Sequence, residues 1–303
     1  MDTLRDRYLN PFTDFGFKKI FGTELNKDLL IDFLNEVIRE RGRITDVNYR
    51  VTEQLGIMEA DRRAIFDIYC QSESGERFIV ELQKAKQNYF RDRSIYYATF
   101  PIQEQAQKGE WDYRLDPVYM VGVLDFVFND EHRDKTVVTE VRLMDTRTRE
   151  VFYDKLAFIY LQMPNFTKVE EQLETHFDKW LYVLKHLPDL QERPARLQER
   201  VFARLFEIAE IAKFTAEERH AYEDSLKHYR DLKNTIDTAR EEGRAEGEQI
   251  GLEKGRAQGE HDGIKMGKIE VARALLSRGM NEAEISRLTG LPQEEIERIA
   301  KGR

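Results

Sequence analysis

The sequence of 303 residues contains a single cysteine, Cys70, so no disulfide can form within the chain. The six histidines are scattered without the spacing of metal-ligand motifs, so the pattern contains no Cys/His zinc site. Cys70 lies within an apolar run, where we expect a buried, inert thiol rather than a nucleophile. The sequence therefore argues against three classes of protein: disulfide-stabilised scaffolds, zinc-binding modules and enzymes with a catalytic cysteine.

Long hydrophobic runs are also missing. No uninterrupted apolar stretch approaches the ~20 residues of a membrane-spanning helix, and the first residues, MDTLRDRYLN, contain no apolar segment typical of a signal peptide. We therefore expect a soluble, cytoplasmic protein.

The chain also has no excess of positive charge, because its formal net charge is −9 and its isoelectric point is about 5.4. This balance argues against a globally basic coat for nucleic acid but permits a local basic groove.

What the chain does contain favours a folded protein with long exposed helices. Hydrophobic residues make up 41% of the sequence, aromatic residues 11% and charged residues 35%. The aromatic content supports a substantial core, and the length suffices for one large domain or two of ordinary size.

Residues 62–84 carry the most informative pattern, RRAIFDIYCQSESGERFIVELQK. Two short apolar runs are joined by Ser-Glu-Ser-Gly, a turn sequence typical of a β-hairpin. Because side chains alternate along a strand, Asp67 should lie on one face of the first strand and Phe66, with Cys70, on the other. A polar residue within such an apolar run requires an explanation.

The second run of this hairpin places Glu81 and Gln83 on one face. Neighbouring strands lie ~4.8 Å apart, so the hairpin can bring Asp67, Glu81 and Gln83 into one cluster. Two carboxylates and an amide on a buried sheet face are costly unless something compensates them. A divalent cation such as Mg²⁺ is the simplest compensation, and the layout is typical of a metal-dependent phosphodiesterase centre in which Gln83 orients the water or the metal.

A second interpretation of the same cluster needs no metal. Asp67 and Glu81 could each pair with a neighbouring cation, Arg62, Arg63 or Lys84, at a sheet edge. Spacing alone does not separate the two interpretations, because such charge patterns also arise by accident.

The remainder of the first half predicts further strands and helices. Apolar residues at helical spacing predict a helix over 27–41, and β-branched alternation predicts a strand over 44–54. The segment 88–108 has helical composition but contains Pro101, which removes a backbone donor and predicts a kink. The near-continuous apolar run at 117–128 predicts a strand buried on both faces. Two further strands are expected, 136–144 and 152–163. This order predicts an α/β fold with a mixed central sheet flanked by helices.

From residue 168 onward the pattern is helical, with three amphipathic segments followed by a glycine repeat. Between Gly243 and Gly267, a glycine recurs at every fourth residue. Seven glycines inside a helix would cost ~7 kcal/mol relative to alanine, so a helix here needs a partner packed closely on the glycine side. Four residues turn a helix by roughly 400°, so the glycine stripe drifts by about 40° per repeat. A charged, partly helical linker is the alternative.

Residues 269–303 have the pattern of a small helix–turn–helix tail. Asn281 and Glu284 form a capping arrangement, and Gly290 marks the turn. The presumed second helix presents mainly acidic residues, which repel phosphate. Dimerisation or protein docking is therefore at least as good an interpretation as DNA recognition, and we expect a homodimer formed through the C-terminal region.

The order of segments resembles a known family. Four segments carry the resemblance: NPFTDFGFKKIFG, LLIDFLNEVI, the Asp67…VELQ segment and RSIYYATFPIQEQAQKGEWDYRLDPVYMVGVLDF. They follow one another as in the bacterial recombination-promoting nucleases and transposases of the PD-(D/E)XK nuclease superfamily. The resemblance covers residues 8–165, and the glycine-repeat tail is also typical of that family. It implies a restriction-endonuclease-like core that cleaves DNA with Mg²⁺ or Mn²⁺.

The resemblance also implies roles for individual residues. Asp67 and Glu81 match the metal-binding carboxylates of the D…(D/E)-x-K motif, and Asp14 resembles the acidic residue that completes the metal site. Gln83 stands where the superfamily has a lysine, and a neutral amide supplies no positive charge to the attacking water, which implies weak or tightly regulated activity. Three residues are implied as DNA contacts, Lys18, Lys19 and Arg93.

These expectations combine into one organisation of the chain. A nuclease-like core (1–165) should be followed by a helical extension (166–240), a glycine-repeat linker or helix (241–268) and a helix–turn–helix-like tail (269–303). The leading hypothesis is a Mg²⁺-dependent DNA endonuclease, with Asp67, Glu81 and Gln83 as its catalytic residues, acting in DNA recombination or mobile-element functions. The alternative is a catalytically weak or inactive nuclease-fold protein that serves as a DNA-binding or oligomerisation module.

Overall fold

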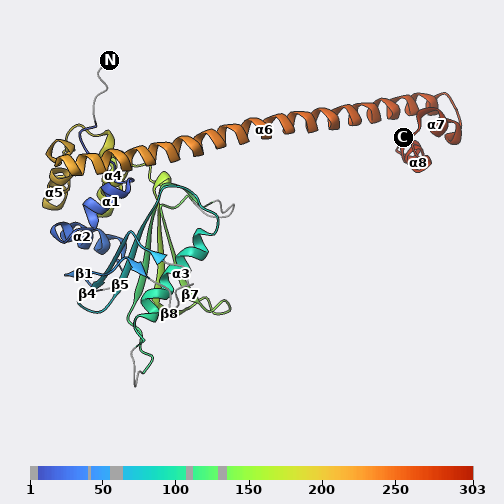
Figure 1. Cartoon of the computed structure of the whole chain (residues 1–303). Helices are drawn as coiled ribbons and strands as arrows, with labels where there is room; N and C mark the ends of the chain where they lie inside the picture. The colour runs from blue at the N-terminus through green and yellow to red at the C-terminus, as the bar shows by residue number, and fades with distance from the viewer. Residues whose placement is uncertain (1–5, 40–41, 55–63, 107–111, 129–134, 303) are drawn as a thin grey trace, which may run out of the picture. The chain divides into compact units, whose positions relative to one another are not determined.

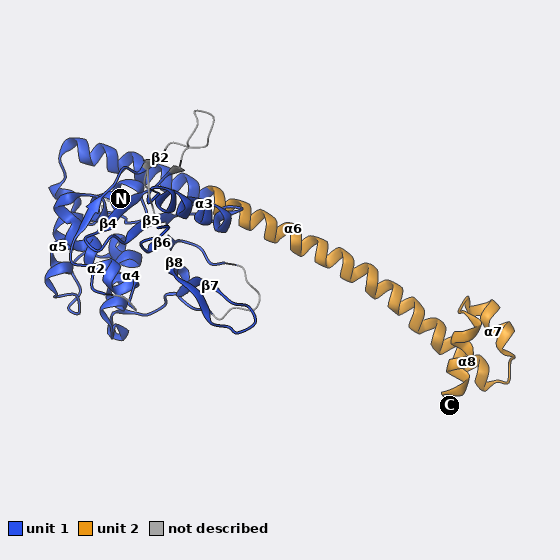
Figure 2. Ribbon diagram, turned by 90° about the horizontal axis from the view of Figure 1, so that it is seen from below, with its two compact units in different colours: residues 1–234 blue, residues 235–303 orange. Residues whose placement is uncertain are grey.

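The computed structural model describes residues 6–39, 42–54, 64–106, 112–128 and 135–302. The chain divides into two compact units, Met1–Asn234 and Thr235–Arg303 (Figure 2). The helices are α1 (Asp14–Phe21), α2 (Lys27–Val37), α3 (Phe90–Gln103), α4 (His176–His186), α5 (Arg200–Ala209), α6 (Ala216–Ser277), α7 (Glu282–Thr289) and α8 (Gln293–Lys301). The strands are β1 (Val47–Tyr49), β2 (Glu53–Gln54), β3 (Ala64–Ile65), β4 (Ile68–Ser72), β5 (Arg77–Gln83), β6 (Val118–Leu124), β7 (Val138–Met144) and β8 (Val151–Gln162). Short 3₁₀ turns connect them at Glu24–Asn26, Met163–Asn165, Glu170–Gln172, Leu187–Asp189 and Ile211–Lys213.

A mixed six-stranded sheet forms the centre of the first unit. Its strand order is β1-β4-β5-β6-β8-β7, in which β5, β6 and β8 run parallel and the outer pairs are antiparallel. The predicted hairpin is present, because β4 pairs with β5 in antiparallel register. Every residue of β6 is buried, as its uninterrupted apolar sequence predicts. The α/β fold with a mixed central sheet flanked by helices is therefore confirmed.

Helices cover both faces of this sheet (Figure 1). One face packs against α1, α2, α4 and α5 in a core that contains Phe33, Trp180 and Val80. The other face packs against α3 in a smaller core that contains Ile79 and Tyr160. Glu81 and Gln83 alternate with Val80 and therefore lie on the α3 face.

The hairpin departs from the expected alternation at one point. The first predicted strand is broken between β3, which pairs with β2 in a separate two-stranded sheet, and β4. A bend at Asp67 separates the two pieces and resets the alternation. Phe66 therefore packs with Tyr69 and Ile79, and the predicted grouping of Phe66 with Cys70 is wrong.

Other predicted elements are present with shorter bounds. The first long helix ends at Val37 rather than at residue 41, and the strand expected over 44–54 is divided between β1 and β2. Pro101 does lie inside α3. Tyr96 on the same helix is 42% exposed.

In the second unit, the end of α6 packs with α7 and α8 around Ala272, Ile285, Leu291 and Ile296. The Asn281 side chain accepts a hydrogen bond from the Glu284 amide at 2.9 Å, as the capping pattern predicts. The glycine repeat lies within α6, and a Cβ placed on any of its seven glycines would meet no atom within 4 Å. None of the described helices is apolar over a length that would cross a membrane.

Candidate active site

The hairpin brings Asp67 and Glu81 together through reciprocal backbone bonds. The Asp67 amide donates to Oε1 of Glu81 at 3.1 Å, and the Leu82 amide donates to Oδ2 of Asp67 at 2.8 Å. Each carboxylate is thus held by the strand that carries the other. Glu81 lies near the C-terminal end of β5 and is only 4% exposed, whereas Asp67 is half-buried.

Burial raises the pKa of both carboxyl groups, and a nearby negative charge adds to the rise in each case. Loss of water and then the charge of Asp67 raise the pKa of Glu81 to about 8. Burial likewise raises the pKa of Asp67, with the Asp14 carboxylate adding to the effect and Lys18 and Lys84 opposing it. Without a cation at this place, the pair holds a proton near neutral pH. A divalent cation fits such a pair, because carboxylate oxygens are its preferred ligands and it would relieve the repulsion.

Gln83 completes the cluster and is fixed at both ends of its amide. Its Nε2 donates to Oε2 of Glu81 at 3.3 Å, and its Oε1 accepts a hydrogen bond from the Arg93 guanidinium. Arg93 lies on α3, and its guanidinium also donates a hydrogen bond to the side chain of Gln87, which precedes that helix. The Arg93 charge also lowers the pKa of Glu81. A positive charge therefore lies beside Gln83, and it comes from an arginine on a different element.

Asp14 lies near the cluster but is paired with another residue. Its Oδ1 accepts an ion-paired hydrogen bond from Nζ of Lys84 at 2.7 Å, and its side chain is 66% exposed. Among the described residues, no three His, Cys, Asp or Glu side chains gather closely enough to hold a metal ion. Asp67 and Glu81 thus form a pair, and the Asp14 carboxylate affects this pair by raising the pKa of Asp67.

The predicted salt bridges and lysine contacts have distinct outcomes. Lys84 pairs with Asp14 rather than with the hairpin carboxylates, and Arg62 and Arg63 lie outside the described residues. Lys19 pairs with Glu218 at 2.6 Å and lies over the Phe214 ring, so its charge is already matched. Lys18 is exposed, and its positive charge lowers the pKa of Asp67.

Two residues beside the cluster were not assigned to the site from the sequence, which named Lys84 only as an ion-pair partner of the hairpin carboxylates and did not name Asp125. Lys84 directly follows β5 and connects it to α1 through Asp14. Asp125 directly follows β6; its amide donates to the Gln83 carbonyl at 2.9 Å, and its carboxylate accepts from the Tyr229 hydroxyl at 3.2 Å. Their position at the carboxyl ends of neighbouring parallel strands is the feature that could have identified them, because ligands collect at that edge of α/β sheets.

A mixed sheet flanked by helices, with an acidic pair at the end of a central strand, defines the restriction-endonuclease-like class of fold. Comparison with protein families agrees with this class. The chain belongs to the PD-(D/E)XK nuclease family transposases, whose family model matches residues 11–239. No match was found among curated proteins or among solved structures.

The raised pKa of Glu81 predicts a pH-dependent stability in metal-free protein. Because folding raises this pKa from 4.5 to about 8, the folded state holds more protons than the unfolded state within that window. The free energy of unfolding should fall as the pH rises from about 4.5 to about 8, by up to ~1.4 kcal/mol for each pH unit. Urea unfolding in EDTA, followed by tryptophan fluorescence, measures this decline.

The Glu81→Gln variant isolates the contribution of this group. Its difference in stability from the wild type should change across the same pH window, since the variant has no proton to lose at this position. Glu223→Gln, at an exposed carboxylate of α6, is the matched control for a lost charge. A difference between wild type and Glu81→Gln that stays constant with pH would contradict the assignment.

Proposed function

We propose that the protein is a Mg²⁺-dependent DNA endonuclease that hydrolyses phosphodiester bonds and acts in DNA recombination or mobile-element functions. The observation that carries the proposal is the Asp67–Glu81 pair at the end of β5, in which Glu81 is buried and Asp67 is half-buried. Its support is the chain's membership of a nuclease family over residues 11–239.

Asp67 and Glu81 are the residues that would hold Mg²⁺ or Mn²⁺. Both present hard oxygen donors, and both have a raised pKa that a neighbouring cation would bring down. When bound, the ion supplies a Lewis acid that polarises a phosphoryl oxygen and lowers the pKa of a bound water. We propose Asp14 as a third carboxylate, because its exposed side chain can turn away from Lys84 toward Asp67.

In this proposal Gln83 orients the attacking water and Arg93 positions Gln83. The amide cannot act as a base, but its two hydrogen bonds fix which of its atoms faces the site. The Arg93 guanidinium places one positive charge beside the position where negative charge builds up on the phosphate. Lys18 is the better of the two lysine candidates for a DNA contact, because Lys19 is matched by Glu218.

Cleavage of supercoiled plasmid tests the proposal directly. Purified wild type should nick or linearise the plasmid with Mg²⁺ or Mn²⁺ and should stop when EDTA is added. Asp67→Ala should lose this activity by at least roughly 100-fold, because the remaining carboxylate cannot hold the ion alone. Asp189→Asn, an exposed carboxylate far along the chain, is the control and should cut as the wild type does.

Equal cutting by the wild type and Asp67→Ala would sink the proposal, since it would point to a contaminating nuclease. A pure wild type that binds DNA but cuts nothing with any divalent metal would instead support a non-catalytic DNA-binding protein.

The contact between Arg93 and Gln83 makes a separate prediction. Arg93→Ala should lower kcat by roughly 10- to 100-fold with a smaller change in KM, because Gln83 loses its orientation and the site loses a charge. Arg93→Lys should restore part of kcat, since it returns the charge without the second hydrogen bond. Arg219→Ala, an exposed arginine on α6, is the matched control. A full kcat in Arg93→Ala would show that Arg93 has no positioning role.

We also propose that the chain forms a homodimer through α6. A helix with seven glycines is costly, and among the residues that the structure describes no atom fills the space beside them. Exposed apolar residues lie on the same part of the helix, among them Leu252, Ile264 and Met266. A partner helix packed on the glycine stripe would compensate both, and because the four-residue spacing exceeds 3.6 residues per turn, the pair would coil with a right hand.

Light scattering should therefore give twice the chain mass of 35.9 kDa. Gly255→Leu should weaken the dimer by blocking close approach, whereas Glu253→Leu, which lies on another face of α6, should not. A monomeric wild type at micromolar concentration would refute the dimer.

A further inference from the structure

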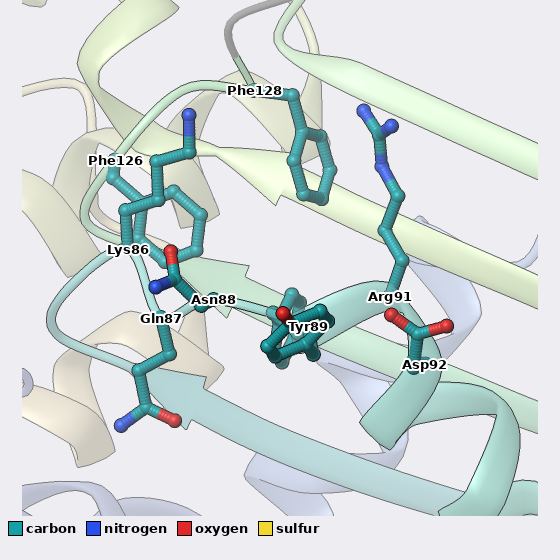
Figure 3. Close-up of a pocket in the computed structure, with 9 residues that line it drawn as sticks. Lys86, Gln87, Asn88, Tyr89, Arg91, Asp92, Phe126 and Phe128 are labelled. Carbon is teal, nitrogen blue, oxygen red and sulfur yellow. The ribbon is translucent and has the colours of Figure 1, made fainter.

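A pocket of about 240 Å³ lies between the segment that follows β5 and the segment that follows β6, near the cluster of Asp67, Glu81 and Gln83 (Figure 3). This volume is below the roughly 300–1,000 Å³ of pockets for drug-sized ligands, so it suits one planar ring system rather than a larger molecule. The lining side chains come from two stretches, Lys86–Asp92 and Phe126–Phe128. Neither stretch has a role in the site described above, apart from the contact between Gln87 and Arg93.

Aromatic rings and cations line this pocket together. Tyr89 is 80% exposed although it is a large aromatic residue, and Phe90, Phe126 and Phe128 complete the aromatic lining. Figure 3 shows the Phe128 ring between the side chains of Lys86 and Arg91, and the Arg91 guanidinium lies 4.6 Å from the centre of that ring.

The charges of the lining are mixed but favour an anion. Lys86 and Arg91 provide two cations, and Asp92 provides one carboxylate. A positive lining is notable in a protein whose net charge is −9. Aromatic faces flanked by cations are the surface that binds nucleotides, because the rings stack on the base and the cations meet the phosphate. The Asp92 carboxylate can accept hydrogen bonds from the amino groups of a base.

The pocket is connected to the cluster by both the backbone and the side chains. Lys86 follows Gln83 by three residues, so the two α-carbons lie at most ~11 Å apart. Gln87 lines the pocket and accepts a hydrogen bond from Arg93, which in turn donates to Gln83. A ligand in the pocket therefore lies next to the proposed scissile phosphate, not at a remote surface.

We infer that this pocket holds one unpaired nucleotide of the DNA, next to the phosphate that is cut, with its base stacked on Tyr89. This inference rests on the proposed nuclease function and names the form of DNA that the site prefers. In an intact duplex, both faces of a base are covered by its neighbours, so only a base outside the stack can present a face to Tyr89. DNA with a bulged or single-stranded nucleotide beside the cut should therefore bind better than continuous duplex.

Binding in EDTA tests this inference without any cleavage. The purified full chain is titrated into a fluorescein-labelled duplex and into the same duplex with a one-nucleotide bulge, and the anisotropy gives each Kd. Tyr89→Ala should weaken binding of the bulged duplex by roughly tenfold and leave binding of the continuous duplex within about twofold. Tyr89→Phe should behave as the wild type, because it keeps the ring.

Tyr113 offers a closely matched control. It is also 80% exposed, and its backbone φ of 60° matches the 64° of Tyr89, but it does not line the pocket. Tyr113→Ala should therefore bind both duplexes as the wild type does. A 2-aminopurine placed in the bulge gives a direct readout, because its fluorescence should fall when it stacks on Tyr89 and should not fall with Tyr89→Ala.

Three outcomes would overturn the pocket assignment: equal binding of both duplexes by the wild type, no binding of either, or an equal loss on both with Tyr89→Ala. Failure of the nuclease proposal looks different. It would appear as Tyr89-dependent binding of the bulged duplex by a protein that cuts no DNA with Mg²⁺ or Mn²⁺. Cleavage of plain duplex without a preference for bulged DNA would instead preserve the nuclease and refute the pocket assignment.

Discussion

The burial of two carboxyl groups side by side is the constraint on which the rest of the site depends. Asp67 and Glu81 face each other across the β4–β5 hairpin, and each accepts a hydrogen bond from the opposite strand. Two negative charges in such a place are unstable unless a proton or a cation neutralises them. The bend at Asp67 and the docking of α3 over the end of β5 both contribute to this arrangement. The structure thus keeps a costly pair in place, which is expected of a functional site and not of a structural core.

Gln83 stands at the position where the superfamily motif has a lysine, and an arginine from another element lies beside it. Arg93 comes from α3, hydrogen-bonds Gln83 and lowers the pKa of Glu81, so one positive charge is present beside the carboxylates after all. An arginine differs from a lysine in that it stays charged and donates several hydrogen bonds in a fixed plane. In this arrangement the positive charge and the Gln83 amide come from different elements, α3 and β5.

Much of the fold could be predicted because it follows from local patterns. β6 is identified by its near-continuous apolar run, and the hairpin before β5 is identified by its Ser-Glu-Ser-Gly turn. The bend at Asp67 could not be predicted, because alternation assumes an unbroken strand, and Phe66 was therefore assigned to the wrong face. The proximity of Asp67, Glu81 and Gln83 was predictable, because the hairpin pairs the two strands and Glu81 and Gln83 are two residues apart on β5. The contacts of Arg93 and Asp125 with Gln83, and of Lys84 with Asp14, depend on tertiary packing, which no local pattern encodes.

The most direct measurement of the central claim is a calorimetric titration of the metal-free protein with Mg²⁺ near pH 7, in two buffers with different heats of ionisation. The account predicts saturable binding with release of about one proton, because Glu81 holds a proton at that pH and must lose it to bind the ion. Glu81→Gln should abolish the proton release, and Asp67→Ala should abolish or greatly weaken the binding. Absence of binding by the wild type, or binding that Asp67→Ala leaves unchanged, would contradict the account.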